Sequence, residues 1–137
     1  MRSASLGALA AALLLSGCGG EIIAPDLFIV NRTGARAGAR LTLLVNEEGG
    51  VNCNGGRTLK LSDSQLVAAR GIQEDLREPA SKHLSLPAAP GSVLSYDVRE
   101  ESGEVRFSDN SPGQPAVFRQ LALFVLQTAQ QVCHLAE

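Results

Sequence analysis

The sequence predicts an α+β fold, in which an antiparallel sheet of four to five strands carries two helices on one face. Residues 41–53 and 94–107 each alternate apolar and polar side chains around a glycine-containing turn, which is typical of a β-hairpin. After each hairpin, at residues 62–79 and 115–134, apolar side chains recur at helical spacing. A short apolar run at residues 27–30 adds a buried first strand.

The first strand is followed by a glycine-rich turn at residues 33–38. Three arginines surround this turn, namely Arg32, Arg36 and Arg40. They have two interpretations: contacts with anionic lipid headgroups, or charges of a solvated turn. The second is the simpler one, because it requires no partner.

The first hairpin places one cysteine on the inner face of the sheet. Leu41, Leu43 and Val45 share a face of the outgoing strand. Val51 and Cys53 share a face of the returning strand. We therefore expect Cys53 to point toward the helices.

The first helix has clear start and stop signals. Ser62 or Asp63 is a natural N-cap, and Pro79 is expected to end the helix. The apolar face consists of Leu66, Ala69, Ile72 and Leu76. Residues 79–92 are rich in Pro, Ser and Ala and show no period, so we expect the longest and most mobile loop here. His83 lies in it, with no role assigned.

The second half of the chain repeats the order of the first. A second hairpin, with Glu100–Glu101 in its turn, resembles the first, which has Glu47–Glu48 there. Pro115 then opens a second helix that runs to about His134 and is apolar around much of its circumference. The repeated order suggests two hairpin-plus-helix units.

The N-terminus has the layout of a secretory signal. Arg2 is followed by an apolar run at residues 6–15 and then by small residues. The run is about 10 residues long, whereas a bilayer-spanning helix needs roughly 20. It is therefore too short to be a permanent anchor.

The motif Leu15-Ser16-Gly17-Cys18 resembles the lipobox of bacterial lipoproteins. The resemblance implies that residues 1–17 are a signal peptide that is removed, and that Cys18 becomes a lipidated first residue bearing palmitate-type acyl chains. Residues 18–26 would then be a short tether and residues 27–137 a single α+β domain. The expected location is the extracytoplasmic face of the cell membrane, or the outer membrane if the host is Gram-negative. An ordinary signal peptide with a chance cysteine is the alternative.

The composition is also similar to that of small lipoproteins of GC-rich bacteria such as actinobacteria. With Cys18 used for lipid, Cys53 and Cys133 remain as a pair in a compartment that permits disulfides. We predict a bridge between them, which in the chain-entropy model stabilises the fold by roughly 4–5 kcal/mol. The alternative is a nucleophilic or metal site built on Cys133 and His134.

Catalytic and metal-binding patterns are missing from the sequence. Neither His83 nor His134 stands in a recognisable triad, and neighbours on a helix point about 100° apart, which suits a Cys133–His134 dyad poorly. The acidic turns lack a calcium-loop pattern. We therefore predict no catalytic residues, no metal ligands and no cofactor. A net charge of −2 argues against nucleic acid as a partner.

The sequence favours a lipid-anchored, non-enzymatic binding protein of the cell envelope. Its partners would be the membrane, through the N-terminal lipid, and an envelope protein or small ligand of unknown identity. Two alternatives stay open. One is an inhibitor of an extracytoplasmic protease that uses loop 79–92, and the other is an envelope enzyme of an unrecognised kind.

Overall fold

The computed structural model describes residues 26–136, which form one sheet and two helices. The predicted α+β class is confirmed, but the sheet has six strands rather than four to five. The elements in chain order are β1 (Asp26–Gly34), β2 (Leu41–Asn46), β3 (Gly50–Cys53), β4 (Thr58–Lys60), α1 (Asp63–Ser81), β5 (Leu94–Glu100), β6 (Gly103–Ser108) and α2 (Ala116–Gln131).

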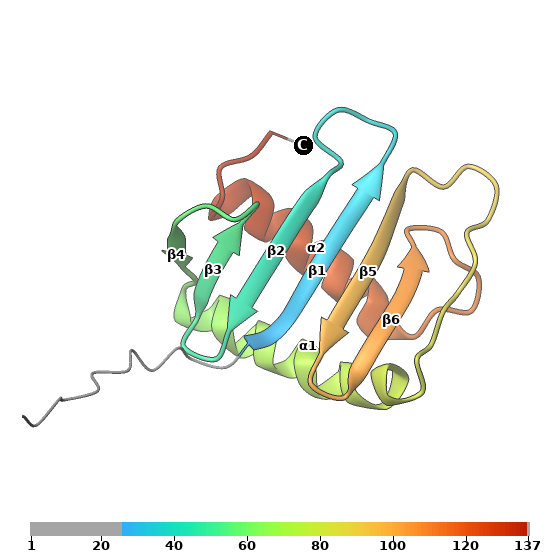
Figure 1. Cartoon of the computed structure of the whole chain (residues 1–137), viewed down its shortest axis with the longest axis horizontal. Coiled ribbons are helices and arrows are strands. Elements are labelled where there is room, and N and C mark those ends of the chain that lie inside the picture. Colours follow the sequence, from blue (N-terminus) through green and yellow to red (C-terminus); the bar gives the residue numbers. More distant parts are fainter. Residues whose placement is uncertain (1–25, 137) are drawn as a thin grey trace, which may run out of the picture.

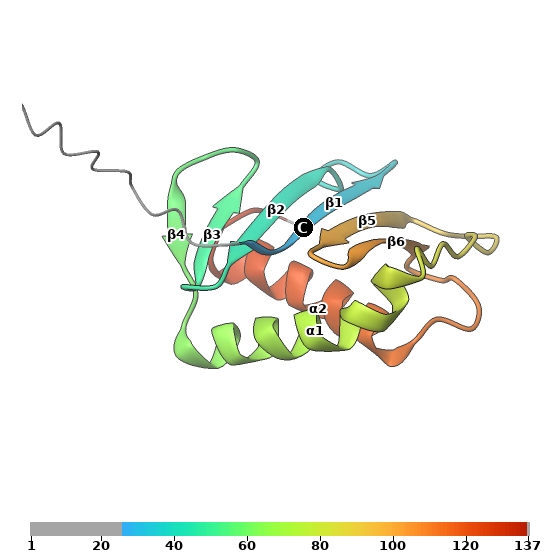
Figure 2. The ribbon, with the colours of Figure 1, turned by 60° about the horizontal axis from the view of Figure 1, so that its bottom comes forward.

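The sheet is open and antiparallel, with strand order β4-β3-β2-β1-β5-β6. Both helices cover the same face, and the opposite face is bare (Figures 1 and 2). The strand missed by the sequence pattern is β4. It has three residues, of which only Leu59 is apolar, so it carries no periodic signal.

The central strand is β1, which pairs with β2 on one side and β5 on the other. It begins one residue before the predicted domain boundary, at Asp26, and continues four residues past the predicted end at Val30. The extension arises because the backbone of residues 31–34 pairs with β5. Polar outward side chains such as Asn31 masked this in the sequence.

The start of α1 follows the prediction and its end does not. The Ser62 hydroxyl accepts from the Gln65 backbone N–H, and the Gln65 side chain accepts from the Ser62 N–H, which makes a full capping box. Pro79 lies inside the last turn instead of ending the helix. Only one intrahelical hydrogen bond is lost there, and Ala80 beyond it is fully buried in the core.

The second helix, α2, begins at Ala116 with Pro115 as its N-cap, one residue later than predicted, and ends at Gln131, short of His134. The backbone N–H groups of Val132 and Cys133 both donate to the Thr128 carbonyl, which closes the last turn. His134 then takes a positive φ of 55°, so the chain leaves the helix axis.

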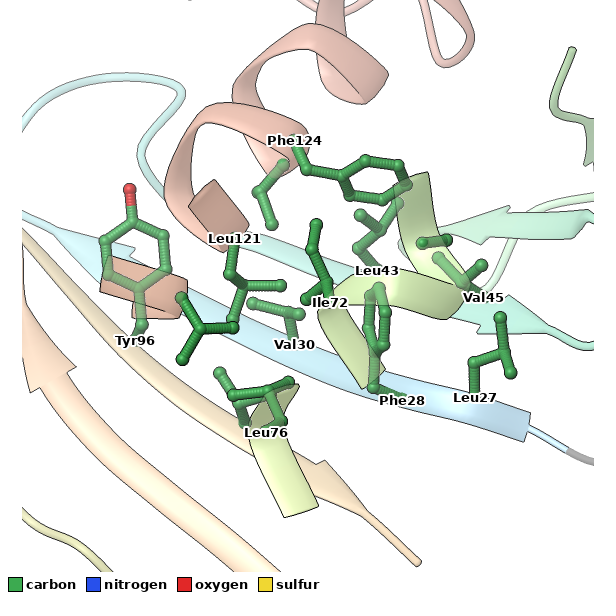
Figure 3. Close-up of a cluster of buried hydrophobic side chains, with 14 of the residues drawn as sticks. Leu27, Phe28, Val30, Leu43, Val45, Ile72, Leu76, Tyr96, Leu121 and Phe124 are labelled. Carbon is green, nitrogen blue, oxygen red and sulfur yellow. The ribbon is translucent and has the colours of Figure 1, made fainter. Parts of the chain in front are cut away.

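The core lies between the sheet and the two helices, and α2 contributes most of its helical part. Phe107 stacks between Tyr96 and Phe118, with ring centroids 4.9 and 4.4 Å apart. Phe28 meets Phe124 edge to face at 5.9 Å. Figure 3 shows apolar side chains from β1, β2, β5, α1 and α2 converging, among them Phe28, Ile72 and Leu121.

The connection between α1 and β5 is tied to the sheet edge. Ser85 forms a parallel bridge with Arg106 of β6, and the Leu86 N–H donates to the Arg106 carbonyl at 2.8 Å. Farther along, the Asn110 side chain accepts from the Ala89 N–H and donates to the Ala89 carbonyl. The segment thus covers the otherwise unpaired edge of β6.

Candidate binding site on the open face of the sheet

The bare face of the sheet carries aligned rows of mostly polar side chains. Because strand side chains alternate, the residues between inward core positions of the regularly paired strands point outward. The first row across the sheet, following the strand register, is Thr58, Asn52, Leu44, Ile29, Arg99 and Glu104. The second row is Thr42, Asn31, Asp97 and Arg106.

The open face is hollowed where β1, β5 and β6 meet the loop after α1. The hollow has a volume of about 420 Å³. Its polar lining comes mainly from Asn31, Thr33, Ser95, Asp97 and Arg106. Leu86 and Ala88 form the apolar rim from the side of the loop. The result is a shallow depression in which polar groups stand among more extensive apolar surface.

Charges in this region concentrate on β5 and β6. The Arg106 Nε lies 3.0 Å from the Asp97 carboxylate, and its Nη2 lies 3.6 Å from Glu104. The Arg106 side chain is 58% exposed, so a ligand can reach the guanidinium while the ion pairs stay in place. On β1 and β2 the groups are neutral, and the Thr42 hydroxyl donates to Asn31 Oδ1 at 2.9 Å.

The rows of the open face contain no aromatic side chain. Stacking on sugar rings or bases, which needs such side chains, therefore does not fit this surface. Amide, hydroxyl and charged groups within reach of one another fit a ligand that forms hydrogen bonds and ion pairs.

Asp109 fixes the end of the hollow by joining the start of β5 to the end of β6. Partial burial acts to raise the pKa of Asp109, but hydrogen bonds from Ser92, Leu94, Val93 and Ser108 outweigh it, so this pKa lies below its ordinary value of 3.8. The Ser92 hydroxyl donates to Asp109 Oδ1 at 2.9 Å. In the sequence, residues 108–113 are a cluster of turn-forming residues that does not reveal this role of Asp109.

The predicted cysteine pair is brought together. The Cα atoms of Cys53 and Cys133 are 6.1 Å apart and their sulfur atoms are at bonding distance. The pair links β3 to the C-terminal end of α2, on the helix side of the sheet, as the inward position of Cys53 predicted. A sulfur held this way is no free nucleophile, so the alternative of a Cys133–His134 dyad is not supported.

The two histidines lie at opposite ends of the sheet. The His83 ring is next to Gly103 of β6, whereas His134 follows the cysteine that is joined to β3. Four strand spacings separate β3 from β6, which is roughly 19 Å. Within residues 26–136, no three His, Cys, Asp or Glu side chains gather in a way that could hold a metal ion.

One glutamate of the second hairpin turn is not solvated. Glu100 occupies an inward position and is 8% exposed. Its Oε1 accepts from the Ser102 N–H at 2.8 Å, while its Oε2 has no hydrogen-bond partner within the described part of the chain. The period-two pattern Tyr96, Val98, Glu100 would have predicted this position.

Arg32 is the clearest departure from the prediction. It lies within β1 and is 1% exposed, so contact with lipid headgroups is excluded for this residue. Its Nε donates to the Ala39 carbonyl at 2.9 Å and its Nη2 to the Gly38 carbonyl at 3.1 Å. Arg32 thus anchors the β1–β2 connection from inside, whereas Arg36 and Arg40 are exposed.

The predicted lipidation residue, Cys18, lies outside the described residues. Among residues 26–136, neither helix has the length and apolar character needed to cross a bilayer. Comparison of the chain with protein-family models, curated proteins and solved structures finds no match in any of the three. The candidate site therefore rests on its own geometry.

Proposed function

We propose that this chain is a lipid-anchored, non-enzymatic binding protein of the cell envelope, and that it binds its ligand on the open face of the sheet. The motif Leu15-Ser16-Gly17-Cys18 supports the anchor. The hollow between β1, β5, β6 and loop 82–93 supports the binding role, and it is the observation on which the proposal depends.

The hollow fits a segment of an envelope protein that carries both polar and small apolar side chains. Asn31, Thr33 and Ser95 offer hydrogen-bonding groups on neighbouring strands, and Asp97 and Arg106 offer both signs of charge. Leu86 and Ala88 can receive one small apolar group beside them. A surface of this kind can bury apolar area and select its partner through the pattern of hydrogen bonds and charges.

The anchor is tested by intact mass of the chain purified from bacterial membranes. The expected mass begins at Cys18 and includes acyl chains. The same sample, alkylated before and after reduction, should show two protected cysteines that become reactive only with reductant. An unlipidated chain that retains residues 1–17 would contradict the anchor.

The binding face is tested by site-specific photo-crosslinking in intact cells. A crosslinking side chain replaces Ser95 in the hollow or, as the control, Lys82 at the exposed end of α1. We expect a discrete envelope-protein adduct from position 95 and none from position 82. Arg106→Ala should reduce the adduct by about tenfold, since loss of a charged contact costs a kcal/mol or more. Equal adducts from both positions would refute the site.

The conformation of the loop after α1 also supports the alternative of a protease inhibitor. Pro87 and Ala88 are exposed, while the residues on either side are hydrogen-bonded to β6 and to Asn110. A loop held in this way is preorganised for insertion into a cleft. Titration of an elastase-type protease, whose pocket takes small residues, should then give stoichiometric inhibition that Ala88→Asp abolishes.

A further inference from the structure

A second surface lies on the far side of the molecule, where α1 and α2 run side by side. A groove of about 330 Å³ separates the outer faces of the two helices. Its apolar lining consists of Ala68, Gly71, Ile72, Leu123 and Phe124. The helices are antiparallel, since the Gln65 side chain at the start of α1 bonds to Gln131 at the end of α2 (Figure 2).

Exposed apolar side chains gather around this groove. Four large hydrophobic side chains of residues 26–136 are exposed, and three of them lie on the helix layer: Val67 at 68%, Leu123 at 54% and Leu126 at 37%. The fourth, Val93, lies before β5, at 43%. Leu123 lies on the α2 wall of the groove and is the most exposed large apolar side chain in its lining.

The α1 wall of the groove carries no side chain at Gly71. A Cβ placed on Gly71 would meet no atom within 4 Å, so nothing inside the chain requires a glycine there. Glycine in a helix interior costs about 1 kcal/mol relative to alanine. A bare backbone on an exposed helix face allows the close approach of another surface.

The charges on the two helices are complementary and partly unpaired. Arg119 is the single charged residue of α2, one turn before Leu123. Asp75 lies on the groove rim one turn after Gly71. Neither Asp75 nor Arg119 has an ion-pair partner among the described residues, whereas Glu74 and Glu78 pair with Arg77 and Lys82.

We infer that the helix layer is a self-association surface whose occupant is a second copy of this chain. A two-fold axis along the groove carries α1 of one copy over α2 of the other. Residues that lie side by side across the groove in one copy then face each other between copies. Leu123 is placed over Gly71 of the second copy, and Arg119 near Asp75 of the second copy.

Self-complementarity favours a second copy over an unrelated partner. Leu123 and Gly71 are on the same chain, and so are the unpaired carboxylate of Asp75 and the unpaired guanidinium of Arg119. Each of the two contacts therefore occurs twice about the axis. In this arrangement both open sheet faces point away from the interface. The inference is therefore independent of the proposed ligand site.

The test measures the protein molar mass of the full chain in detergent by light scattering, with the detergent contribution subtracted. The wild type is expected at the mass of two chains. Leu123→Glu should raise the dissociation constant more than about tenfold, as expected for a central interface residue. Val93→Glu, the same change at an exposed apolar residue off the helix layer, should leave the mass at two chains.

Charge exchange identifies the orientation. Asp75→Arg alone and Arg119→Asp alone should each weaken the dimer, and the double variant Asp75→Arg/Arg119→Asp should restore it. All four residues involved are exposed, so circular dichroism should show native folding in every variant. A wild type with the mass of one chain, a Leu123→Glu variant that stays dimeric, or a double variant weaker than both singles would overturn the inference.

Discussion

The two faces of the sheet are built from the same strands but differ in what covers them. On β1 the inward residues Phe28, Val30 and Arg32 are all 1% exposed or less, while the outward residues Asn31 and Thr33 are exposed. The covered face packs against two helices and includes the aromatic stack of Tyr96, Phe107 and Phe118. The open face contacts no helix (Figure 1).

The difference shows how the source of stability is separated from the surface proposed for binding. Burial of apolar surface against α1 and α2 supplies most of the folding free energy. The outward positions contribute little to it, so their identity can follow the needs of a ligand. Substitutions on the two faces should therefore have very different effects on unfolding.

The largest effect is expected at Phe118. This residue is fully buried and stacks on Phe107 at 4.4 Å, so Phe118→Ala should lower the free energy of unfolding by about 3–5 kcal/mol. Denaturant unfolding followed by circular dichroism measures the change. Val93→Ala, at an exposed site, is the control and should stay within about 0.5 kcal/mol. A loss below about 1 kcal/mol for Phe118→Ala would contradict the covered core.

The next effect concerns the cysteine pair, which fastens the covered face at one corner. Removing it with Cys53→Ser/Cys133→Ser should cost about 2–5 kcal/mol, because the bond closes a loop with a sequence separation of 80 residues. Reductant should destabilise the wild type by a similar amount. The double variant should be insensitive to reductant, which distinguishes loss of the bond from a general effect of the reagent.

A matched pair on β1 compares the two faces directly. Arg32→Ala leaves the carbonyls of Gly38 and Ala39 without their donor and opens a cavity, so we expect a loss of about 2–4 kcal/mol. Asn31→Ala removes one exposed hydrogen bond to Thr42 and should cost less than about 1 kcal/mol. Equal losses of unfolding free energy in Arg32→Ala and Asn31→Ala would contradict the distinction between the two faces.

The smallest effect is a pH dependence at the rim of the open face. Because the pKa of Asp109 is lowered in the folded chain, its contribution to stability is present above the ordinary value of 3.8 and is lost as the pH falls through the folded pKa. Asp109→Asn should remove this dependence of the free energy of unfolding on pH, because asparagine does not ionise. Unfolding curves between pH 2 and 5 would measure it. An unchanged pH slope in Asp109→Asn would contradict the stabilising role of the ionised Asp109 side chain.

Much of the covered face was predictable because local periodicity reports burial. Both hairpins, the inward position of Cys53 and the start of α1 at Ser62 follow from alternation and capping rules. The failures occur where local signals were absent or misleading. Residues 58–60 have one apolar side chain and form a strand through backbone pairing with β3. Pro79 carries a stop signal, but burial of Ala80 outweighs it.

The prediction for Arg32 was wrong for a related reason. A charged residue beside a glycine-rich stretch indicates a turn, and the sequence shows no partner that would justify its burial. The carbonyls that accept its hydrogen bonds, at Gly38 and Ala39, become available only after the β1–β2 connection folds back. The candidate site could not be predicted from the sequence either, because its residues come from β1, β5, β6 and a loop that meet only in the folded chain.

By itself, the sequence determined the α+β class, the order of hairpins and helices, and the pairing of Cys53 with Cys133. These depend on side-chain periodicity and on a count of cysteines, which are local properties of the chain. The tertiary structure alone decided the strand order, the burial of Arg32, the hollow on the open face and the groove between the helices. Each of these requires contacts between residues far apart in the chain, and such contacts exist only once the sheet and helices have packed.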